Sequence, residues 1–473
     1  MSERTVVDVA VVGGGIAGLS AAYELRQRGI RTVVLEAADR PGGVAMTERR
    51  DGWVIDGGPD ALLVQKPAAV ALCRELGLGD RLHPTLEPRT AYVLRDGALH
   101  PLVEGSFLGF PVRFGALARS SLFTARGKLR MAMEIALPAR EGDDDESIAT
   151  FVRRRFGQEA VDYLAEPLLA GIHAGDAERL SLRTLFPRLA DAEREHGSVL
   201  RAFRRLRAAP TPHGAFVSLP GGVGELVEAV AAALDPGVLR LSSRVTDIHR
   251  ASTYVLRAGT TTIEASAVIL CIPAYAAAGL LRGLDTTLAG LCDAVPYAST
   301  ATVALGFRRA QVAHALSGTG FVVPRVERTP LLAATWVTSK WPGRAPPDHV
   351  LLRAFLGGGR DAHRLDRDDE DLLATALESL RDILGITGEA SVARLFRWTR
   401  QSPQYEVGHV DRVAAIERRL ESSPGLFLAG SGFRAIGIPD CIADGRQTGA
   451  RAAALLAARG GPVTRPGDGA PRA

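Results

Sequence analysis

Lysine and cysteine are scarce in this chain of 473 residues. The three lysines are Lys66, Lys128 and Lys340, so arginine supplies nearly all of the positive charge. The four cysteines form no C-x-x-C pair, which argues against a zinc site or a redox dithiol, and we predict no bound metal. So few cysteines in so long a chain are typical of a reducing compartment.

Long uncharged apolar runs are also absent. The longest, Ala265 to Leu281, contains Pro273 and is shorter than the roughly 20 apolar residues of a membrane-spanning helix. The apolar N-terminal stretch contains Asp8 and three glycines, so we do not expect a signal peptide. The net charge of +4 is small for this length and argues against nucleic acid as a partner. A composition of 46% hydrophobic and 23% charged residues is typical of a globular chain with two or three domains.

The first forty residues carry a nucleotide-binding pattern. A strand at Val6 to Val12 precedes Gly13-x-Gly15-x-x-Gly18, a helix to Arg28 follows, and a second strand at Thr32 to Leu35 ends at Glu36. Such a βαβ unit directs a helix N-terminus at a pyrophosphate, and the terminal acid accepts hydrogen bonds from a ribose. The loop residues predicted to bind are Gly13, Gly14, Gly15, Ile16, Ala17 and Gly18, together with Glu36. Ala37 and Ala38 offer no cation for a 2′-phosphate, which argues against NADP.

Two further segments extend this prediction. Arg40-Pro41-Gly42-Gly43 can clamp a pyrophosphate from its other side, or it can be an ordinary turn after a strand. Some 400 residues later, the glycine-rich segment Gly430 to Gly437 follows a short strand and precedes a helix that starts near Pro439. The positive end of that helix would stabilise negative charge on a bound flavin ring. Between these two ends, residues 60–210 are predicted to be mostly helical, and residues 216–400 mix strands and helices.

The glycine loop, Glu36 and Arg40-Pro41-Gly42-Gly43 resemble those of the amine-oxidase-like flavoprotein superfamily. Other segments resemble, in the same order, the oxygen-dependent porphyrinogen oxidases of that superfamily, which make protoporphyrin IX or coproporphyrin III. These segments are Asp56-Gly57-Gly58-Pro59-Asp60, Glu166 to Asp176, Leu219-Pro220-Gly221-Gly222, Ser339 to Arg344, Trp398 with Pro403-Gln404-Tyr405, and Gly437 to Ile442.

The resemblance implies an α/β fold with a discontinuous Rossmann-type FAD-binding domain, a mixed α+β substrate domain and a helical insert. The implied boundaries are 1–60, 215–295 and 400–458 for the FAD domain, 61–214 for the insert, 296–399 for the substrate domain and 459–473 for a disordered tail. The resemblance implies further cofactor contacts at Arg40, Gly42, Gly43, Gly57, Gly58, Pro59, Asp60, Val245, Trp398, Ile436, Gly437 and Ile438.

The implied reaction is the oxidation of a porphyrinogen to a porphyrin in heme biosynthesis. In each of three rounds a hydride passes from a bridging carbon to flavin N5. Dioxygen then reoxidises the flavin and is reduced to hydrogen peroxide. The cofactor carries this redox chemistry, so we assign no catalytic side chain. The candidate substrates, protoporphyrinogen IX and coproporphyrinogen III, stay undecided. Alternatives on the same fold are an amine oxidase, a carotenoid desaturase or a non-catalytic porphyrin-binding flavoprotein.

The substrate carries propionate groups, which need cationic partners. Arg89 and Arg95 flank Tyr92-Val93-Leu94, where the family places a propionate-binding arginine, and Asp60 can accept a hydrogen bond from a pyrrole N–H. We expect a cytoplasmic protein. Apolar residues of 107–114 and 122–137 either lie on the inner face of the cell membrane or face a protein core. Whether the chain forms a homodimer is left open, and Cys441 is predicted to be a buried packing residue.

Overall fold

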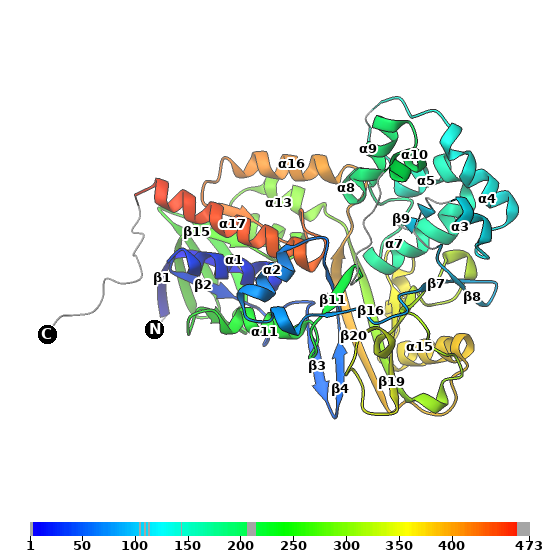
Figure 1. The fold of residues 1–473 in the computed structure, drawn as a ribbon. Helices are drawn as coiled ribbons and strands as arrows, with labels where there is room; N and C mark the ends of the chain where they lie inside the picture. Colours follow the sequence, from blue (N-terminus) through cyan, green and yellow to red (C-terminus); the bar gives the residue numbers. More distant parts are fainter. Residues whose placement is uncertain are drawn as a thin grey trace.

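The computed structural model of the protein describes residues 3–103, 106–107, 110–111, 114–142, 144–205 and 214–460. These residues form two large β-sheets, several layers of helices around the first sheet, and a separate group of helices beside the second (Figure 1). The tail predicted from residue 459 lies outside the described residues from residue 461 on. Within the described ranges, none of the helices combines the length and the apolar character that a bilayer crossing requires.

The first sheet has a parallel core made from both ends of the chain. Its strands are β1 (Glu3–Val12), β2 (Thr32–Leu35), β12 (Leu239–Arg240), β13 (Val245–Arg250), β14 (Tyr254–Ala258), β15 (Thr261–Leu270) and β21 (Leu426–Leu428). The order is β12-β2-β1-β15-β14-β13, and β21 pairs in parallel with the end of β15. Alternate residues of β1 face two different hydrophobic clusters, so both faces of the sheet are covered. The sheet therefore leaves only β15 between the end of the N-terminal strand and a strand that begins at residue 426.

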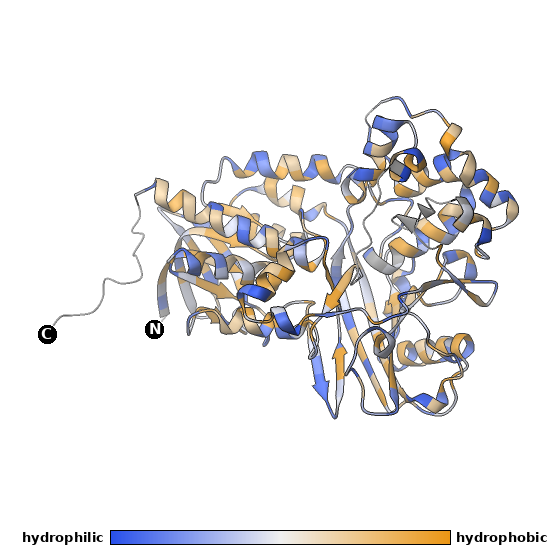
Figure 2. Ribbon diagram, viewed as in Figure 1, coloured by the Kyte–Doolittle hydropathy of each residue, from blue (hydrophilic) through white to orange (hydrophobic). Residues whose placement is uncertain are grey.

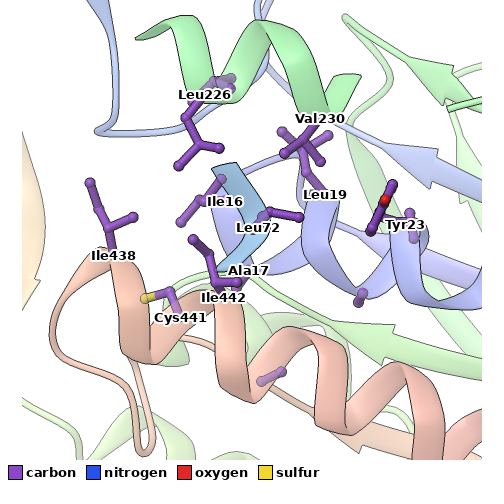
Figure 3. Close-up of a cluster of buried hydrophobic side chains, with 14 of the residues drawn as sticks. Ile16, Ala17, Leu19, Tyr23, Leu72, Leu226, Val230, Ile438, Cys441 and Ile442 are labelled. Carbon is purple, nitrogen blue, oxygen red and sulfur yellow. The ribbon is translucent and has the colours of Figure 1, made fainter. Parts of the chain in front are cut away.

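Helices cover both faces of this sheet. On one face lie α1 (Ile16–Gln27), α2 (Ala68–Glu75), α11 (Gly224–Ala232) and α17 (Ile438–Ala458), and on the other lie α12 (Ala274–Leu281), α13 (Thr286–Asp293) and α16 (His409–Leu420). Figure 3 shows side chains of α1 packed between those of α11 and α17. A Cβ atom at Gly445 would lie 2.1 Å from the carbonyl oxygen of Ala17, so only glycine permits this approach of α17 to α1. Cys441 is buried in the same cluster, as predicted.

The second sheet is largely antiparallel, with the order β20-β16-β19-β18-β17-β7-β8. Its strands are β7 (Ala91–Arg95), β8 (Ala98–Pro101), β16 (Tyr297–Arg308), β17 (Gly320–Val322), β18 (Ala333–Trp336), β19 (His349–Gly357) and β20 (Val392–Pro403). The helix α15 (Asp369–Leu384) packs its apolar face on this sheet through Leu372, Ala376 and Leu380. Figure 2 shows that many helices mix hydrophilic and hydrophobic residues, and that the hydrophilic strand β3 lies beside the largely hydrophobic strand β4.

A lobe of short helices lies beside the second sheet. It contains α3 (Phe114–Arg119), α4 (Ala125–Ala132), η2 (Met133–Ala136), α5 (Ile148–Phe156), α6 (Gln158–Ala160), the π-helical turn η3 (Val161–Ala165), α7 (Glu166–His173), α8 (Leu182–Leu185), α9 (Pro187–His196) and α10 (Val199–Arg205). Its core contains a fully buried ion pair between Arg155 and Glu134. Glu166 connects the lobe to the second sheet, because its carboxylate accepts from Arg360 at 2.6 Å and from the Arg325 amide at 2.9 Å.

Small sheets connect these parts, and two tight hairpins occur, one of them within the segment predicted to be mostly helical. The hairpin β3 (Thr47–Arg50) with β4 (Trp53–Asp56) turns at Asp51-Gly52, and the hairpin β7–β8 turns at Asp96-Gly97. All four turn residues have positive φ, as such tight turns require, and Asp-Gly is a strong hairpin signal. The mostly helical prediction for 60–210 was therefore wrong at 91–101. A third sheet joins β5 (Leu62–Leu63), β11 (Phe216–Ser218) and β6 (His83–Pro84).

Candidate cofactor and substrate site

The glycine loop between β1 and α1 leaves open space for a ligand. Gly13 has a φ of 103°, and a Cβ atom on Gly18 would lie only 1.9 Å from the Gly13 carbonyl oxygen. Gly15 differs, because its φ of −67° suits any residue and a Cβ atom there would meet nothing within 4 Å. Glycine at position 15 is therefore not needed for the packing of the protein itself. This is the cradle expected where a phosphate approaches the first turn of α1.

Glu36 is held at the end of β2, facing this loop. Its carboxylate accepts from the Gly14 amide at 2.6 Å and from the Ala38 amide at 2.8 Å. Each oxygen keeps a lone pair for a further donor. The backbone of Glu36 also accepts from the Ser243 amide at 2.7 Å, so Val245, which follows in β13, lies at the same edge of the sheet. Glu36 and Val245 are thus brought together although they are far apart in the sequence.

The Arg40-Pro41-Gly42-Gly43 segment folds onto the glycine loop. The Gly42 amide donates to the Gly14 carbonyl at 2.8 Å, and Gly15 and Gly42 form a bridge like that of two paired strands. The Arg40 guanidinium donates to the carbonyl of Gly43 at 2.7 Å, which fixes it beside the turn. The segment is therefore more than a free turn after a strand, since it packs against the glycine loop.

The start of α17 approaches the cradle from the C-terminal half of the chain. Gly437 caps the helix, and its amide is 3.3 Å from Asp440 Oδ2, which also accepts from Lys66 Nζ at 2.6 Å. The preceding loop is anchored because the Gly430 amide donates to Asp444 at 2.6 Å. Ile436, in contrast, is 36% exposed although it is a large apolar residue. An exposed isoleucine beside a helix N-terminus suits the flat face of an aromatic ring system.

The turn from Asp56 to Asp60 is held at both ends by one segment of the second sheet. Arg344 donates to Asp56 at 2.9 Å, and Lys340 donates to Asp60 at 2.9 Å. Arg344 also donates to Ser218 Oγ at 2.9 Å and to the Leu219 carbonyl at 3.0 Å. Three of the segments used for the family resemblance, 56–60, 219–222 and 339–344, therefore meet at one buried ion pair.

The middle of this turn packs tightly against β20 and against Val44, which precedes β3. The Trp398 indole donates to the Gly57 carbonyl at 2.9 Å, and a Cβ atom at Gly57 would lie 2.8 Å from the ring of Phe396. A Cβ atom at Gly58 would lie 1.9 Å from the carbonyl oxygen of Val44. Both glycines are therefore required by the protein, and they bring the backbone of the turn next to the predicted contact residue Trp398.

Asp60 carries an unusual electrostatic environment. Burial alone would raise the pKa of its carboxyl group, but Lys340 and Arg353 lower it more strongly, with help from hydrogen bonds, and the net pKa lies far below the ordinary value. Asp60 is therefore ionised at any physiological pH and can only accept hydrogen bonds. Arg353 was missed in the sequence analysis. A lone arginine within the apolar run Leu351 to Leu356 was its signal, because buried charges need partners.

The two arginines predicted to bind propionate have different surroundings. Arg95 lies in β7 and donates to Glu159 at 2.7 Å and to the Leu122 carbonyl at 2.5 Å, so it links the second sheet to the helical lobe. Arg89 donates to the Thr85 carbonyl at 3.0 Å and lies 3.1 Å from the exposed Glu87. The next amide, that of Leu86, donates to the Lys340 carbonyl at 3.1 Å, which places the Arg89 segment beside the Asp60 cluster.

These features together fit a flavin dinucleotide better than a smaller ligand. The cradle at Gly15, the ribose-type acid Glu36 and the capped helix α17 follow one another along a single edge of the first sheet, at the carboxyl ends of its parallel strands. The turn 56–60 extends the site toward the second sheet, where Trp398 of β20 donates to the Gly57 carbonyl. The predicted cofactor residues lie at this edge or in the segments that pack against it.

The family model for flavin containing amine oxidoreductases matches residues 16–456. Coproporphyrinogen III oxidase of Bacillus subtilis is 36% identical over 454 residues, which cover 93% of this chain and 96% of that protein. Mitochondrial protoporphyrinogen oxidase of Nicotiana tabacum is 27% identical over 482 residues, covering 92% and 93%. A crystal structure from Exiguobacterium sp. 255-15, provisionally assigned as a protoporphyrinogen oxidase, aligns with a TM-score of 0.86 and 32% identity over 96% of this chain and 99% of that one.

Proposed function

Because the chain belongs to the flavin containing amine oxidoreductase family, we propose that it oxidises coproporphyrinogen III to coproporphyrin III in porphyrin and heme biosynthesis, with dioxygen as acceptor. The observation that carries this proposal is the similarity to coproporphyrinogen III oxidase of Bacillus subtilis over nearly the full length of both chains. Identity to the protoporphyrinogen oxidase of Nicotiana tabacum is lower, 27% against 36%, which favours coproporphyrinogen III over protoporphyrinogen IX.

The cofactor predicted from the sequence, FAD, agrees with the flavin-containing family, and the residues at the edge of the first sheet fit it. We propose that Gly13 to Gly18 and Arg40 to Gly43 bind its pyrophosphate, and that Glu36 and Val245 bind its adenosine part. Gly57 to Asp60, Trp398 and Ile436 to Ile438 would surround its ring system. When bound, FAD supplies the two-electron chemistry that removes a hydride from a bridging carbon in each of three rounds.

The protein's own residues then bind and orient the porphyrinogen. Of the two predicted arginines, Arg89 is favoured for a propionate, because its acidic neighbour Glu87 is exposed to solvent, whereas Arg95 is paired with the less exposed Glu159 and with the Leu122 carbonyl. Asp60, held ionised, can accept hydrogen bonds from the pyrrole N–H groups and thereby hold the macrocycle at one height above the cofactor. No side chain needs to act as a general base, since pyrrole protons leave once the ring is conjugated.

The domain division and the location of the protein are also proposals. Residues 1–60, 215–295 and 400–458 would form the FAD domain, 296–399 the substrate domain and 61–214 a helical insert, and the protein would be cytoplasmic. Leu129 of α4 and Met133, one turn later, are 64% and 51% exposed, which supports contact of this insert with a membrane surface. Residues 107–114, the other apolar segment of that prediction, have side chains outside the described part of the chain.

The test is a direct comparison of substrates. Purified protein reconstituted with FAD is given coproporphyrinogen III, protoporphyrinogen IX or an alkylamine under air, and porphyrin fluorescence and hydrogen peroxide are followed. We expect fluorescence with peroxide from coproporphyrinogen III, less from protoporphyrinogen IX, and no peroxide from the amine. Peroxide from the amine alone, or binding of porphyrin without turnover, would overturn the proposal in favour of an amine oxidase or a non-catalytic carrier.

A further inference from the structure

Lys340 occupies a position that the proposed reaction has not yet used. It ends the short helix α14 (Val337–Lys340), and its ammonium group donates to both carboxylate oxygens of Asp60, at 2.9 and 3.1 Å. An ammonium group has three N–H donors, so one remains for another acceptor. The Trp341 indole completes the cluster by donating to Asp60 at 3.2 Å.

The cluster carries more positive than negative charge. Arg353 Nη1 lies 3.6 Å from Asp60, so two cations face one carboxylate. The neighbouring pair of Asp56 and Arg344 is balanced and does not change this excess. A buried charge that is not neutralised is unfavourable, and an additional anion at this point would be bound favourably.

Burial identifies which member of the cluster can meet a ligand. The side chain of Arg353 is 2% exposed, and its Nη1 and Nε atoms have no hydrogen-bond partner and no access to solvent. The side chains of Lys340 and Asp60 are each 14% exposed. The donor that a ligand can reach is therefore on Lys340, whereas the buried Arg353 contributes only its charge.

The position of Lys340 relative to Arg89 suggests which anion it binds. The Lys340 carbonyl accepts from the Leu86 amide, and Arg89 bonds to the carbonyl of the adjacent Thr85. Two cationic groups thus project from neighbouring segments next to the turn that ends at Asp60. Coproporphyrinogen III carries four propionates, whereas protoporphyrinogen IX carries two propionates and two vinyl groups in place of the others.

We propose that Lys340 is a specificity residue that binds a propionate which coproporphyrinogen III has and protoporphyrinogen IX lacks. Asp60 holds the ammonium group in place, and Arg353 keeps the cluster positive. The inference rests on the proposed function, because it names the feature of the substrate that this part of the site recognises. Arg89 would bind a propionate that both substrates share.

The experiment measures KM and kcat of Lys340→Met for the two porphyrinogens. We expect KM for coproporphyrinogen III to rise about ten- to a hundredfold, as for loss of one charge-assisted hydrogen bond, and KM for protoporphyrinogen IX to stay within about twofold. Lys340→Arg should recover most of the loss. Lys128→Met is the matched control, because it removes the same charge from a lysine of α4 that donates to the Ala118 carbonyl at 2.8 Å.

The outcomes separate a specificity role of Lys340 from a general structural role and from failure of the proposed function. Equal rises of KM for both substrates, or a fall of kcat for both at unchanged KM, would overturn the inference, since a general structural role or a role in oxygen reactivity would act on both. If the unmodified protein oxidises neither porphyrinogen, the proposed function fails instead. Binding of the product porphyrins gives a readout without turnover, and Lys340→Met should weaken coproporphyrin III but not protoporphyrin IX. If Lys340→Met does not fold, Lys340→Gln, which keeps a donor for Asp60, carries the same comparison.

Discussion

The buried pair of Asp56 and Arg344 should determine both the stability of the protein and its affinity for FAD. Asp56 accepts from Arg344 at 2.9 Å, from the Val223 amide at 2.9 Å and from the Thr47 hydroxyl at 2.5 Å. Both charged side chains are almost completely buried. Asp56→Asn keeps the shape of the side chain but leaves the Arg344 charge without its counter-ion.

The expected cost is about 3–5 kcal/mol of unfolding free energy, the usual result of removing one partner from a buried pair. Because Asp56 precedes the turn at 57–60, the affinity for FAD should fall as well. Asp56→Asn combined with Arg344→Met should be more stable than Asp56→Asn alone, since the double variant leaves no buried charge unpaired.

Urea unfolding followed by circular dichroism, and FAD titration followed by flavin fluorescence, measure the two effects. Asp51→Asn is the control, because Asp51 lies at the exposed tip of the β3–β4 hairpin, and its pair with Arg50 is in solvent. Asp51→Asn should change the unfolding free energy by no more than about 0.5 kcal/mol. The reasoning is refuted if Asp56→Asn unfolds at the same urea concentration as Asp51→Asn, or if the double variant is less stable than the single one.

Three further changes test other parts of the site. Gly15→Leu should leave the fold intact, because no atom lies near the new Cβ, yet abolish FAD binding, and circular dichroism with flavin absorbance checks both. Arg89→Gln should raise KM about tenfold for both porphyrinogens, as steady-state kinetics would show. Burial lowers the pKa of His409 to about 4, so its contribution to stability is present above the unfolded pKa near 6.5 and is lost as the pH falls from there toward 4. His409→Gln should therefore flatten the decline in urea midpoint between pH 7 and pH 5, to which the histidine contributes about 2 kcal/mol.

The sequence predicts the N-terminal strand, glycine loop and helix well because their determinants are local. A strand, a glycine loop and a helix follow one another within thirty residues, and the observed bounds of β2 agree with the prediction. The β7–β8 hairpin was missed although its Asp-Gly turn is equally local, so that error came from overlooking a signal that the sequence contains.

The substrate half is harder to predict because its contacts join residues far apart in the chain. Asp60 and Lys340 are 280 positions apart, and neither residue alone indicates the other. For Arg95 the sequence suggested a ligand, and the unseen partner was a residue of the protein. Its place in β7 made it a candidate for propionate, and only the folded chain shows that Glu159 from the helical lobe lies 2.7 Å away. A charged residue in a sequence shows that a partner is needed, but the fold decides whether that partner belongs to the protein or to the substrate.

The two aspartates of one turn show how this division arises. Asp56 and Asp60 are paired with Arg344 and Lys340, which come from a single segment, so the turn and that segment act as one unit. At Asp56 the charges balance and solvent is excluded, which suits a structural pair. At Asp60 the additional charge of Arg353 leaves the cluster positive, and the Lys340 ammonium group is partly exposed. One short turn can therefore anchor the cofactor site through its first aspartate and present a cation to an anionic substrate through its last, and the variants of Asp56 and Lys340 should separate these two effects.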